Sequence, residues 1–413
     1  MKSAIITIGD ELLIGQIVNT NQAYIAGRLN AAGVSVERML TVGDDLDGIL
    51  AAFRECWSSF QVVIVTGGLG PTHDDVTKKA VCRFFDMGLA SRPDLRESIQ
   101  TLLAKRGTRW GPTAEEQTLF PDNAEVIPNP VGTAAGILVA RGGKYFMVLP
   151  GVPFEMKEMV DQTIIPLLES TVTGSVIRHR TLRTTGVTES MLAGQLGDVN
   201  LFLEGARLAF LPSPAGVRLR VSLRDQDALT AERRMQRIEE TIRSKVGTYI
   251  YGIGEEELAE VLGRLLKERH LTIAVAESCT GGLIADKITD VSGSSGYLDR
   301  GLIAYSNRSK TELLGVPAEL IARTGAVSQE VAEAMAAGVR QRSGTDIGLS
   351  TTGIAGPTGG TAEKPVGLVW IGYSDASQTV ARRHLFGEGR ARVKERAAQA
   401  ALELVRRMLL GLD

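Results

Sequence analysis

Several features that would place this chain in a special class are scarce or missing. Only three cysteines occur, Cys56, Cys82 and Cys279, and their wide spacing and odd number argue against a disulfide framework or a cysteine-rich zinc site. No apolar run approaches the roughly 18 residues of a transmembrane helix. The opening MKSAIITIGDELL is typical of a first strand and not of a signal peptide, so we expect a cytoplasmic protein without a membrane partner.

An excess of positive charge is also missing. Lys and Arg total 46 against 48 Asp and Glu, which gives a formal net charge of -2 and no bulk basic field for nucleic acid, although a local patch stays open. Aromatic residues make up 5% of the chain and offer few platforms for stacking single-stranded bases. Nucleic acid is therefore not the expected partner, and small molecules are.

The remaining composition is that of an ordinary globular protein, with 44% hydrophobic and 23% charged residues. At roughly 150 residues per domain, 413 residues suggest two or three domains. The patterns predict an α/β domain over residues 1–170, a small α+β linker domain over 171–252, and a second α/β domain over 253–413.

The first domain alternates apolar strands with helical patterns. Strands are predicted at 4–8, 34–42 and 62–66, and helices at 21–32 and 46–57. Such alternation favours a parallel sheet with helices on both faces, whose ligands lie beyond the carboxyl ends of the strands.

The other two domains show shorter, mixed patterns. In the middle domain, strands are predicted at 178–184, 206–210 and 217–222, and helices at 188–196 and 229–246. In the third domain, helices are predicted at 256–269, 329–342 and 390–410, and strands at 271–276, 301–304, 347–351, 367–374 and 379–386. The third domain contains motifs that suggest catalysis, whereas the middle domain contains no such motif.

A glycine-rich loop follows the third predicted strand, with the sequence GGLGPTHDDVT over 67–77. Glycines let the backbone approach a ligand, and the N–H groups at a helix start favour phosphate. A tight turn with an Asp cap explains the same residues.

Carboxylates cluster around this predicted phosphate site, which suggests a divalent cation with oxygen ligands. They are Asp10, Glu11, Asp74, Asp75 and Glu155. Each of them can instead cap its own helix, and which would contact the metal directly stays open.

Four motifs together resemble the N-terminal domain of the CinA family, itself similar to the molybdopterin-binding fold. They are GDELLIG, TGGLGPTHDDVT, NPVGTAAG and LPGVPFEMK, in order over residues 1–170. The resemblance implies a three-layer α/β domain that hydrolyses the pyrophosphate of ADP-ribose with a divalent metal such as Mg, Mn or Co. Of the five candidate carboxylates, we expect Asp74, Asp75 and Glu155 to lie near the metal. The resemblance also implies substrate contacts from Gly68, Gly70, Thr72, Asn129, Gly132 and Thr133. Ala135 stands where many members have proline.

The third domain contains AESCTGG at 276–282, a sharp strand-to-helix turn. Such a turn can present the Oγ of Ser278 beside backbone N–H groups that would stabilise an oxyanion. A Ser/Thr cap with packing glycines is the alternative. Cys279 is a rival nucleophile, since a helix N-terminus acidifies a thiol, but adjacent side chains at a turn point in different directions.

A nucleophilic serine needs a base, and the histidines do not supply one in a Ser-His-Asp order. They are His73, His179, His270 and His384. Lys310 can serve if burial lowers its pKa, and it follows a predicted strand together with Tyr305, on the sheet edge where Ser278 lies. An ordinary solvated lysine is the alternative.

Two further elements of this domain suggest phosphate binding. The loop 351–357, TTGIAGP, follows a strand and offers hydroxyl and N–H groups. Arg390 and Lys394 lie one turn apart at the start of the last helix, where they can hold a phosphate or simply face solvent.

The motifs AESCTGG, AYSNRSK, TTGIAGPTGG and GEGR resemble the CinA C-terminal domain over 255–413. This resemblance implies a metal-free amidohydrolase that converts nicotinamide mononucleotide to nicotinic acid mononucleotide and ammonia. It implies Ser278 as the nucleophile, activated by Tyr305 and Lys310, and a homodimer. It implies substrate contacts from Cys279, Thr280, Gly281, Thr352, Gly353 and Arg390. Lys394 stands where a second basic residue, often Arg, is expected.

Two alternatives stay open at this point. The first alternative is that only one of the two predicted sites is active. The second is that the chain is a nucleotide- or molybdopterin-binding scaffold in competence or the DNA-damage response. Ammonia release from nicotinamide mononucleotide separates the enzyme from the scaffold.

Overall fold

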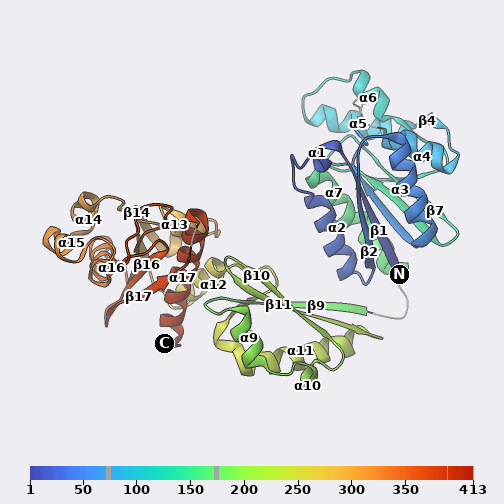
Figure 1. The fold of residues 1–413 in the computed structure, drawn as a ribbon. Coiled ribbons are helices and arrows are strands. Elements are labelled where there is room, and N and C mark those ends of the chain that lie inside the picture. Colours follow the sequence, from blue (N-terminus) through green and yellow to red (C-terminus); the bar gives the residue numbers. More distant parts are fainter. Residues whose placement is uncertain (71–75, 172–175, 388, 413) are drawn as a thin grey trace. The chain divides into compact units, whose positions relative to one another are not determined.

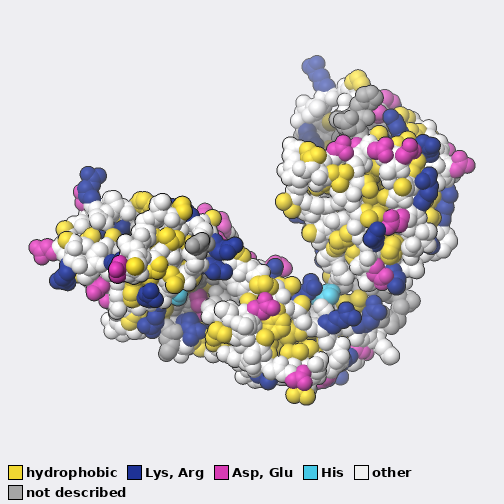
Figure 2. All heavy atoms as spheres, viewed as in Figure 1, with side chains coloured by type: hydrophobic (Ala, Val, Ile, Leu, Met, Phe, Trp, Pro, Cys, Tyr) yellow, Lys and Arg dark blue, Asp and Glu magenta, His cyan; other side chains and the backbone are white. Residues whose placement is uncertain are grey.

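The computed structural model describes residues 1–70, 76–171, 176–387 and 389–412 (Figure 1). The chain forms two compact units, residues 1–178 with 224–232 and residues 179–223 with 233–413. Among the described residues, no helix is both long and apolar enough to cross a membrane. Acidic and basic side chains are interspersed over the visible face (Figure 2), in keeping with the near-zero net charge.

A six-stranded sheet with the order β2-β1-β3-β8-β7-β6 forms the centre of the first unit. Its strands are β1 (Lys2–Ile8), β2 (Ser35–Val42), β3 (Val62–Thr66), β6 (Glu125–Ile127), β7 (Gly136–Arg141) and β8 (Lys144–Leu149), and β4 (Leu89–Ser91) pairs separately with β5 (Leu119–Pro121). The helices are α1 (Asp10–Leu13), α2 (Thr20–Ala31), α3 (Leu46–Ser59), α4 (Thr77–Phe85), α5 (Pro93–Lys105), α6 (Pro112–Gln117), α7 (Pro153–Met159), the π-helical turn η1 (Val160–Ile164) and α8 (Ile165–Thr171).

Both faces of this sheet are covered, so the predicted three-layer α/β fold is confirmed. Because side chains alternate along a strand, Ile6 of β1 packs on one face with Phe53 of α3. Its neighbour Ile5 packs on the other face with Leu29 of α2 and Met156 of α7. Each face buries its own apolar cluster against the sheet.

The three strands predicted from the sequence do run parallel, and two strands that it did not predict, β6 and β7, run antiparallel. β2, β1, β3 and β8 run parallel, whereas β7 pairs antiparallel with β8 and β6 antiparallel with β7. The reason is the two-residue turn between β7 and β8. Gly142 and Gly143 have φ values of 58° and 73°, which glycine adopts at little cost and which suit a hairpin turn.

The carboxyl ends of β1, β3 and β8 lie next to one another at one edge of the sheet. There Gly67 has φ 112°, and a Cβ on it would lie 2.2 Å from Ile8 O. Only glycine lets the loop after β3 approach β1 this closely. This edge is where ligands bind in open α/β sheets.

The middle part of the chain forms a small α+β domain around a four-stranded sheet with the order β10-β11-β9-β12. Its elements are β9 (Val176–Thr184), α9 (Glu189–Leu196), α10 (Asn200–Leu203), β10 (Arg207–Ser213), β11 (Gly216–Asp225), α11 (Ala228–Val246), the 3-10 turn η2 (Gly247–Tyr249) and β12 (Ile250–Ile253). The α+β prediction for this part is confirmed.

The C-terminal part has a five-stranded sheet with the order β14-β13-β15-β16-β17. Its elements are α12 (Leu258–Glu268), β13 (Ile273–Glu277), α13 (Leu283–Thr289), the 3-10 turn η3 (Ser294–Gly296), β14 (Leu298–Ile303), α14 (Asn307–Leu314), α15 (Ala318–Thr324), α16 (Gln329–Ser343), β15 (Ile347–Gly353), β16 (Leu368–Ser374), β17 (Thr379–Leu385) and α17 (Arg390–Leu410). β13 runs parallel to β14 and β15, and the remaining neighbours pair antiparallel.

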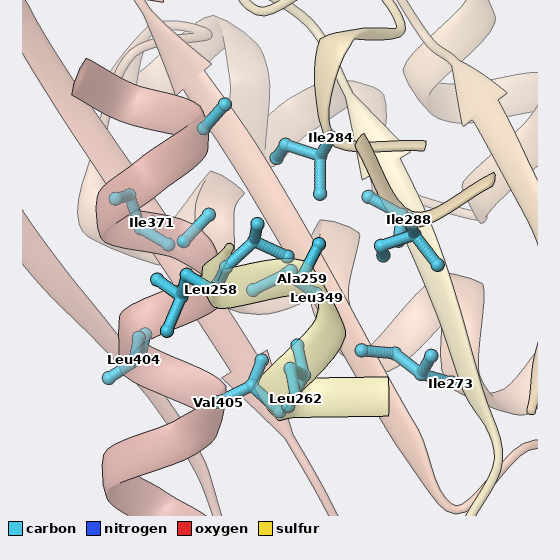
Figure 3. Packing of buried hydrophobic residues seen from close by; sticks show 14 of the residues in the cluster. Leu258, Ala259, Leu262, Ile273, Ile284, Ile288, Leu349, Ile371, Leu404 and Val405 are labelled. Atoms are coloured by element: carbon cyan, nitrogen blue, oxygen red, sulfur yellow. The ribbon is translucent and has the colours of Figure 1, made fainter. Parts of the chain in front are cut away.

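The largest cluster of buried apolar side chains in this part joins α12 and α17 to the sheet. Figure 3 shows Leu262 of α12 beside Val405 of α17. Leu258 lies one turn before Leu262, and Leu404 of α17 and Ile371 of β16 belong to the same cluster. This packing holds α17 firmly on one face, and α16 covers the other.

Glycine permits the close approach of α16 to the sheet. A Cβ on Gly348 of β15 would lie 2.1 Å from Ala336 O of α16. We therefore expect Gly348→Ala to lower the free energy of unfolding by about 1–3 kcal/mol, because an added methyl group must push the helix away. Scanning calorimetry of the full chain measures this as a lower Tm. The control Gly296→Ala has open space around its Cβ; an equal Tm loss in both variants would contradict this account.

Candidate active sites

Ser278 lies at the carboxyl end of β13, a central strand flanked by β14 and β15. Its N–H donates to Thr351 O at 3.0 Å, which fixes the residue beside the end of β15. Gly281 and Gly282 follow with φ values of 64° and 97°, so the chain turns at once into α13. The predicted strand-to-helix turn is therefore present.

Glu277 stabilises this turn, a role that the sequence analysis missed. Its carboxylate accepts hydrogen bonds from the backbone N–H groups of Gly282 at 2.9 Å, Ile284 at 3.1 Å and Ala285 at 2.8 Å. The side chain is 1% exposed, so these bonds replace its hydration. An acid just before a predicted helix start is a signal that could have been used.

Lys310 is buried directly against Ser278, so the alternative of a solvated lysine is wrong. The residue is 1% exposed, and its Nζ lies 2.9 Å from Ser278 Oγ, 2.9 Å from Ala304 O and 3.3 Å from Tyr305 O. A capping box between Ser306 and Ser309 fixes the first turn of α14, from which Lys310 reaches inward.

The surroundings of Lys310 make its charged form less favourable than it is in water. Burial lowers the pKa of Lys310, since the charged form loses its hydration. A neutral amine has two N–H donors and one lone pair. A charged Lys310 donates to Ser278 Oγ and to the two carbonyl oxygens. In the neutral form the carbonyl oxygens can accept both donors, which leaves the lone pair for the hydrogen of the Ser278 hydroxyl.

Cys279 does not have the properties of a reactive thiol. It is 6% exposed, and burial raises its pKa to about 12, an effect larger than any acidification at the turn. Thr280 is fully buried, and its Oγ1 lies 2.7 Å from Thr351 Oγ1. Thr280 and Gly281 are not among the residues that line the cavity described next, so the substrate contacts predicted for them stay predictions.

A cavity of about 180 Å³ opens in front of Ser278 and Lys310. Its wall contains seven of the predicted site residues, namely Ser278, Cys279, Tyr305, Lys310, Thr352, Gly353 and Arg390. It also contains four residues that the sequence analysis did not single out: Asn307, Ala326, Val327 and Ala355. Asn307 stands inside the AYSNRSK motif, which was the available signal for it.

Tyr305 and Arg390 are linked at this cavity. Arg390 donates to the Tyr305 hydroxyl at 2.9 Å and to Gly356 O at 3.1 Å. Tyr305 is 59% exposed and meets Lys310 through its backbone carbonyl. The Thr352 hydroxyl donates to Ala326 O at 2.7 Å, which holds the opposite wall in place.

The acidic turn after β1 is hydrogen-bonded to the loop after β2. Asp10 Oδ1 accepts from Asp44 N at 3.2 Å, and Asp44 Oδ2 accepts from Asp10 N at 3.0 Å. A Cβ on Gly43 would lie 2.4 Å from Asp10 Oδ1, so this pair requires glycine there. Asp10 and Glu11 are both on the exposed helix α1.

Glu155 meets the predicted binding loop after β6. Its Oε2 accepts from Asn129 Nδ2 at 2.7 Å, and a Cβ on Gly132 would lie 2.1 Å from the same oxygen. Thr133 is half-buried in this loop. On the loop after β3, Gly68 has φ 65° and packs against Thr77 at the start of α4, with Gly70 two residues on.

The predicted metal ligands are not all within the described part of the chain. Thr72, Asp74 and Asp75 lie outside the described residues. Among the residues that are described, no group of three or more His, Cys, Asp or Glu is arranged to hold a metal ion. Asp10, Glu11 and Glu155 therefore do not form a ligand set by themselves, and the metal site stays a prediction that depends on Asp74 and Asp75.

Comparison with known proteins accounts for nearly the whole chain. Residues 4–170 match the "Probable molybdopterin binding domain", 179–252 the "Damage-inducible protein CinA KH domain", and 255–409 the "CinA C-terminal domain". A "CinA-like protein" of Salinibacter ruber is 46% identical over 99% of this chain and 100% of its own length. The chain belongs to the CinA family. The resemblance drawn from the motifs is thus confirmed.

Another relative also matches over its full length, and a solved structure matches part of the chain. A "Putative competence-damage inducible protein" of Caldicellulosiruptor saccharolyticus is 40% identical over 100% of both chains. A crystal structure of "competence/damage inducible protein CihA from Agrobacterium tumefaciens" is 38% identical and covers 37% of this chain and 96% of that chain, with a TM-score of 0.36.

The buried state of Cys279 can be tested without any substrate. With a pKa of about 12, its thiolate fraction at pH 8 is about 10³-fold below that of an ordinary thiol. Iodoacetamide should therefore leave Cys279 unmodified in the native protein while it alkylates all three cysteines in guanidinium chloride, as peptide mass spectrometry would show. Rapid native alkylation of Cys279 would return it to the list of nucleophiles.

Proposed function

We propose that the C-terminal domain is a serine amidohydrolase that deamidates nicotinamide mononucleotide to nicotinic acid mononucleotide and ammonia. The observation that carries the proposal is the pair of Ser278 Oγ and buried Lys310 Nζ, 2.9 Å apart. A neutral amine held against a serine hydroxyl is a nucleophile with its base. The small cavity in front of the pair gives a carboxamide access to it.

In the proposed first step, Ser278 Oγ attacks the carboxamide carbon while Lys310 Nζ takes the hydroxyl proton. The backbone N–H groups of Cys279, Thr280 and Gly281 are assigned to the oxyanion. Those of Ser278 and Gly282 already donate to Thr351 O and to Glu277. Lys310 then returns the proton to the leaving nitrogen, ammonia departs, and water hydrolyses the acyl-serine.

The rest of the substrate fits the charges around the cavity. The exposed ring of Tyr305 suits the positively charged pyridinium ring, which favours the face of an aromatic side chain. The Arg390 guanidinium, held by Gly356 O and the Tyr305 hydroxyl, is placed to receive the phosphate. We assign Tyr305 to substrate positioning, because its hydroxyl is bonded to Arg390 and not to Ser278.

Removal of either member of the pair should abolish deamidation. We expect Ser278→Ala and Lys310→Met each to lower kcat/KM for ammonia release by about 10³-fold or more, since nucleophile and base act as a unit. The control Ser295→Ala, on an exposed turn, should keep wild-type activity. Unchanged turnover in a folded Ser278→Ala protein would remove the serine from the mechanism. No turnover by folded wild type would favour the scaffold alternative.

The pH dependence follows from the lowered pKa of Lys310. The base is active only when deprotonated, so kcat/KM should rise with pH through the folded-state pKa of Lys310 and level off above it. Because that pKa lies below the usual 10.5, the rise should be centred below 10.5. Steady-state rates across pH measure this, and a rise centred at or above 10.5 would show that Lys310 is not the base.

We further propose that the N-terminal domain hydrolyses the pyrophosphate of ADP-ribose with a divalent metal. The supporting observation is that Glu155, Asn129 and Gly132 meet beside a glycine-rich sheet edge suited to phosphate. A bound metal would neutralise phosphate oxygens and activate water. Since the described acids alone do not form a ligand set, no step is assigned to a particular metal ligand.

Chelation should separate the two proposed activities. EDTA should stop AMP formation from ADP-ribose and leave ammonia release unchanged, because the serine mechanism uses no metal. Mg²⁺, Mn²⁺ or Co²⁺ added after dialysis should restore the first reaction, as chromatography of the products would show. Loss of ammonia release on chelation would contradict the metal-free assignment.

We also propose that the protein is a homodimer. Sedimentation equilibrium of the full chain measures this directly, and a monomer mass would contradict it.

A further inference from the structure

The sheet of the middle domain carries the helices of that domain on one side only. Figure 1 shows α9, α10 and α11 together on one side of the strands β9, β10 and β11. Side chains alternate along β11, where Leu219 and Val221 are buried, whereas Arg218 is half-buried and Arg220 is exposed. The arginines therefore lie on the face of the sheet that these helices leave open.

Strand pairing brings a third arginine to the same face. In the antiparallel register of β10 with β11, the exposed Arg207 lies opposite Ser222, two residues after Arg220. His179 of β9 lies beside the same serine, with 2.8 Å between His179 Nδ1 and Ser222 Oγ. Figure 2 shows dark-blue side chains gathered over this part of the middle domain. We call Arg207, Arg218 and Arg220 the arginine face.

No neighbouring acid neutralises the arginine face. Within the described ranges, none of its three arginines forms an ion pair or a side-chain hydrogen bond, and the Nε of Arg218 is buried without a partner. Burial and the positive charge of Arg220 both lower the pKa of His179. Arg183, farther along β9, is instead paired with Glu257 at 2.7 Å and is not counted here. The near-zero net charge of the chain thus conceals a local basic patch.

We propose that the arginine face binds the phosphate backbone of single-stranded nucleic acid. Alternate residues of a strand lie about 6–7 Å apart, so Arg218 and Arg220 can hold different phosphates of a flexible strand. All three cations are arginines, whose planar guanidinium groups bind phosphate through two parallel N–H bonds. No aromatic residue belongs to the arginine face on which a base could stack, so the backbone and not the sequence is recognised.

Two observations separate this surface from other sites for polyanions. Proteins that lie on a membrane surface insert apolar side chains beside their basic ones, and the described residues of β9, β10 and β11 include no exposed large apolar side chain. KH domains hold nucleic acid with a GXXG loop, whereas the loop between α9 and α10 reads GDVN over 197–200 and lacks the second glycine. The arginine face is a different surface from that loop.

Fluorescence anisotropy of short labelled DNA and RNA strands with the full chain tests the proposal. Three phosphate contacts predict that affinity falls roughly 20-fold between about 50 and 200 mM salt. Strands of unrelated sequence should bind alike, and a strong preference among them would overturn recognition by the backbone. No binding at low salt would overturn the proposal. Binding to phosphatidylserine vesicles without binding to the strands would also overturn it, in favour of a membrane. The outcome does not depend on either proposed reaction.

Charge-reversal variants locate the binding surface. Arg220→Glu and Arg207→Glu, both at exposed positions, should each raise the Kd by about tenfold or more, because a phosphate contact becomes a repulsion. The matched control Arg233→Glu is exposed on α11, among the helices of the same domain, and should leave the Kd unchanged. Circular dichroism should show the same Tm for all three. Equal weakening by Arg233→Glu would show a general effect of net charge and overturn the arginine face as the site.

Discussion

The burial of Lys310 against Ser278 is the constraint on which the proposed chemistry depends. A lysine in water is charged at neutral pH and cannot accept a proton, so the fold must remove the amine from solvent to make it a base. It does so by directing the side chain from the first turn of α14 under the end of β13, where two backbone carbonyls and the serine hydroxyl surround Nζ. Burial of this polar group is tolerated because all three neighbours are hydrogen-bonding partners.

The position of Ser278 depends in turn on a second buried group, Glu277. The serine can face the cavity only if the chain leaves β13 and enters α13 within a few residues, and a short turn exposes several backbone N–H groups. Glu277 accepts three of these groups, and two glycines with positive φ complete the turn. The buried carboxylate of Glu277 therefore stabilises the turn, whereas the buried amine of Lys310 is proposed to act as the base.

Helix α17 connects this site to the rest of the second unit. Its apolar face packs on α12 and the sheet (Figure 3), and its first residue, Arg390, lines the cavity in front of Ser278. Its later turns line a second cavity of about 740 Å³. Membership of the CinA family accounts for the series of three domains. The larger cavity forms where β17, α17 and the loop after β9 come together.

The sequence by itself determined the domain series, the α/β class and most elements, because apolar periodicity and glycine turns are local signals. It also brought Ser278, Tyr305, Lys310 and Arg390 into one hypothesis through their motifs, and the structure places all four around one cavity. Tertiary structure alone decided that Lys310 is buried and that burial raises the pKa of the Cys279 thiol. It also decided that Arg390 donates a hydrogen bond to the Tyr305 hydroxyl. It also decided that β7 and β6 run antiparallel. Burial, pKa and strand direction depend on residues distant in the chain, and no local pattern contains them.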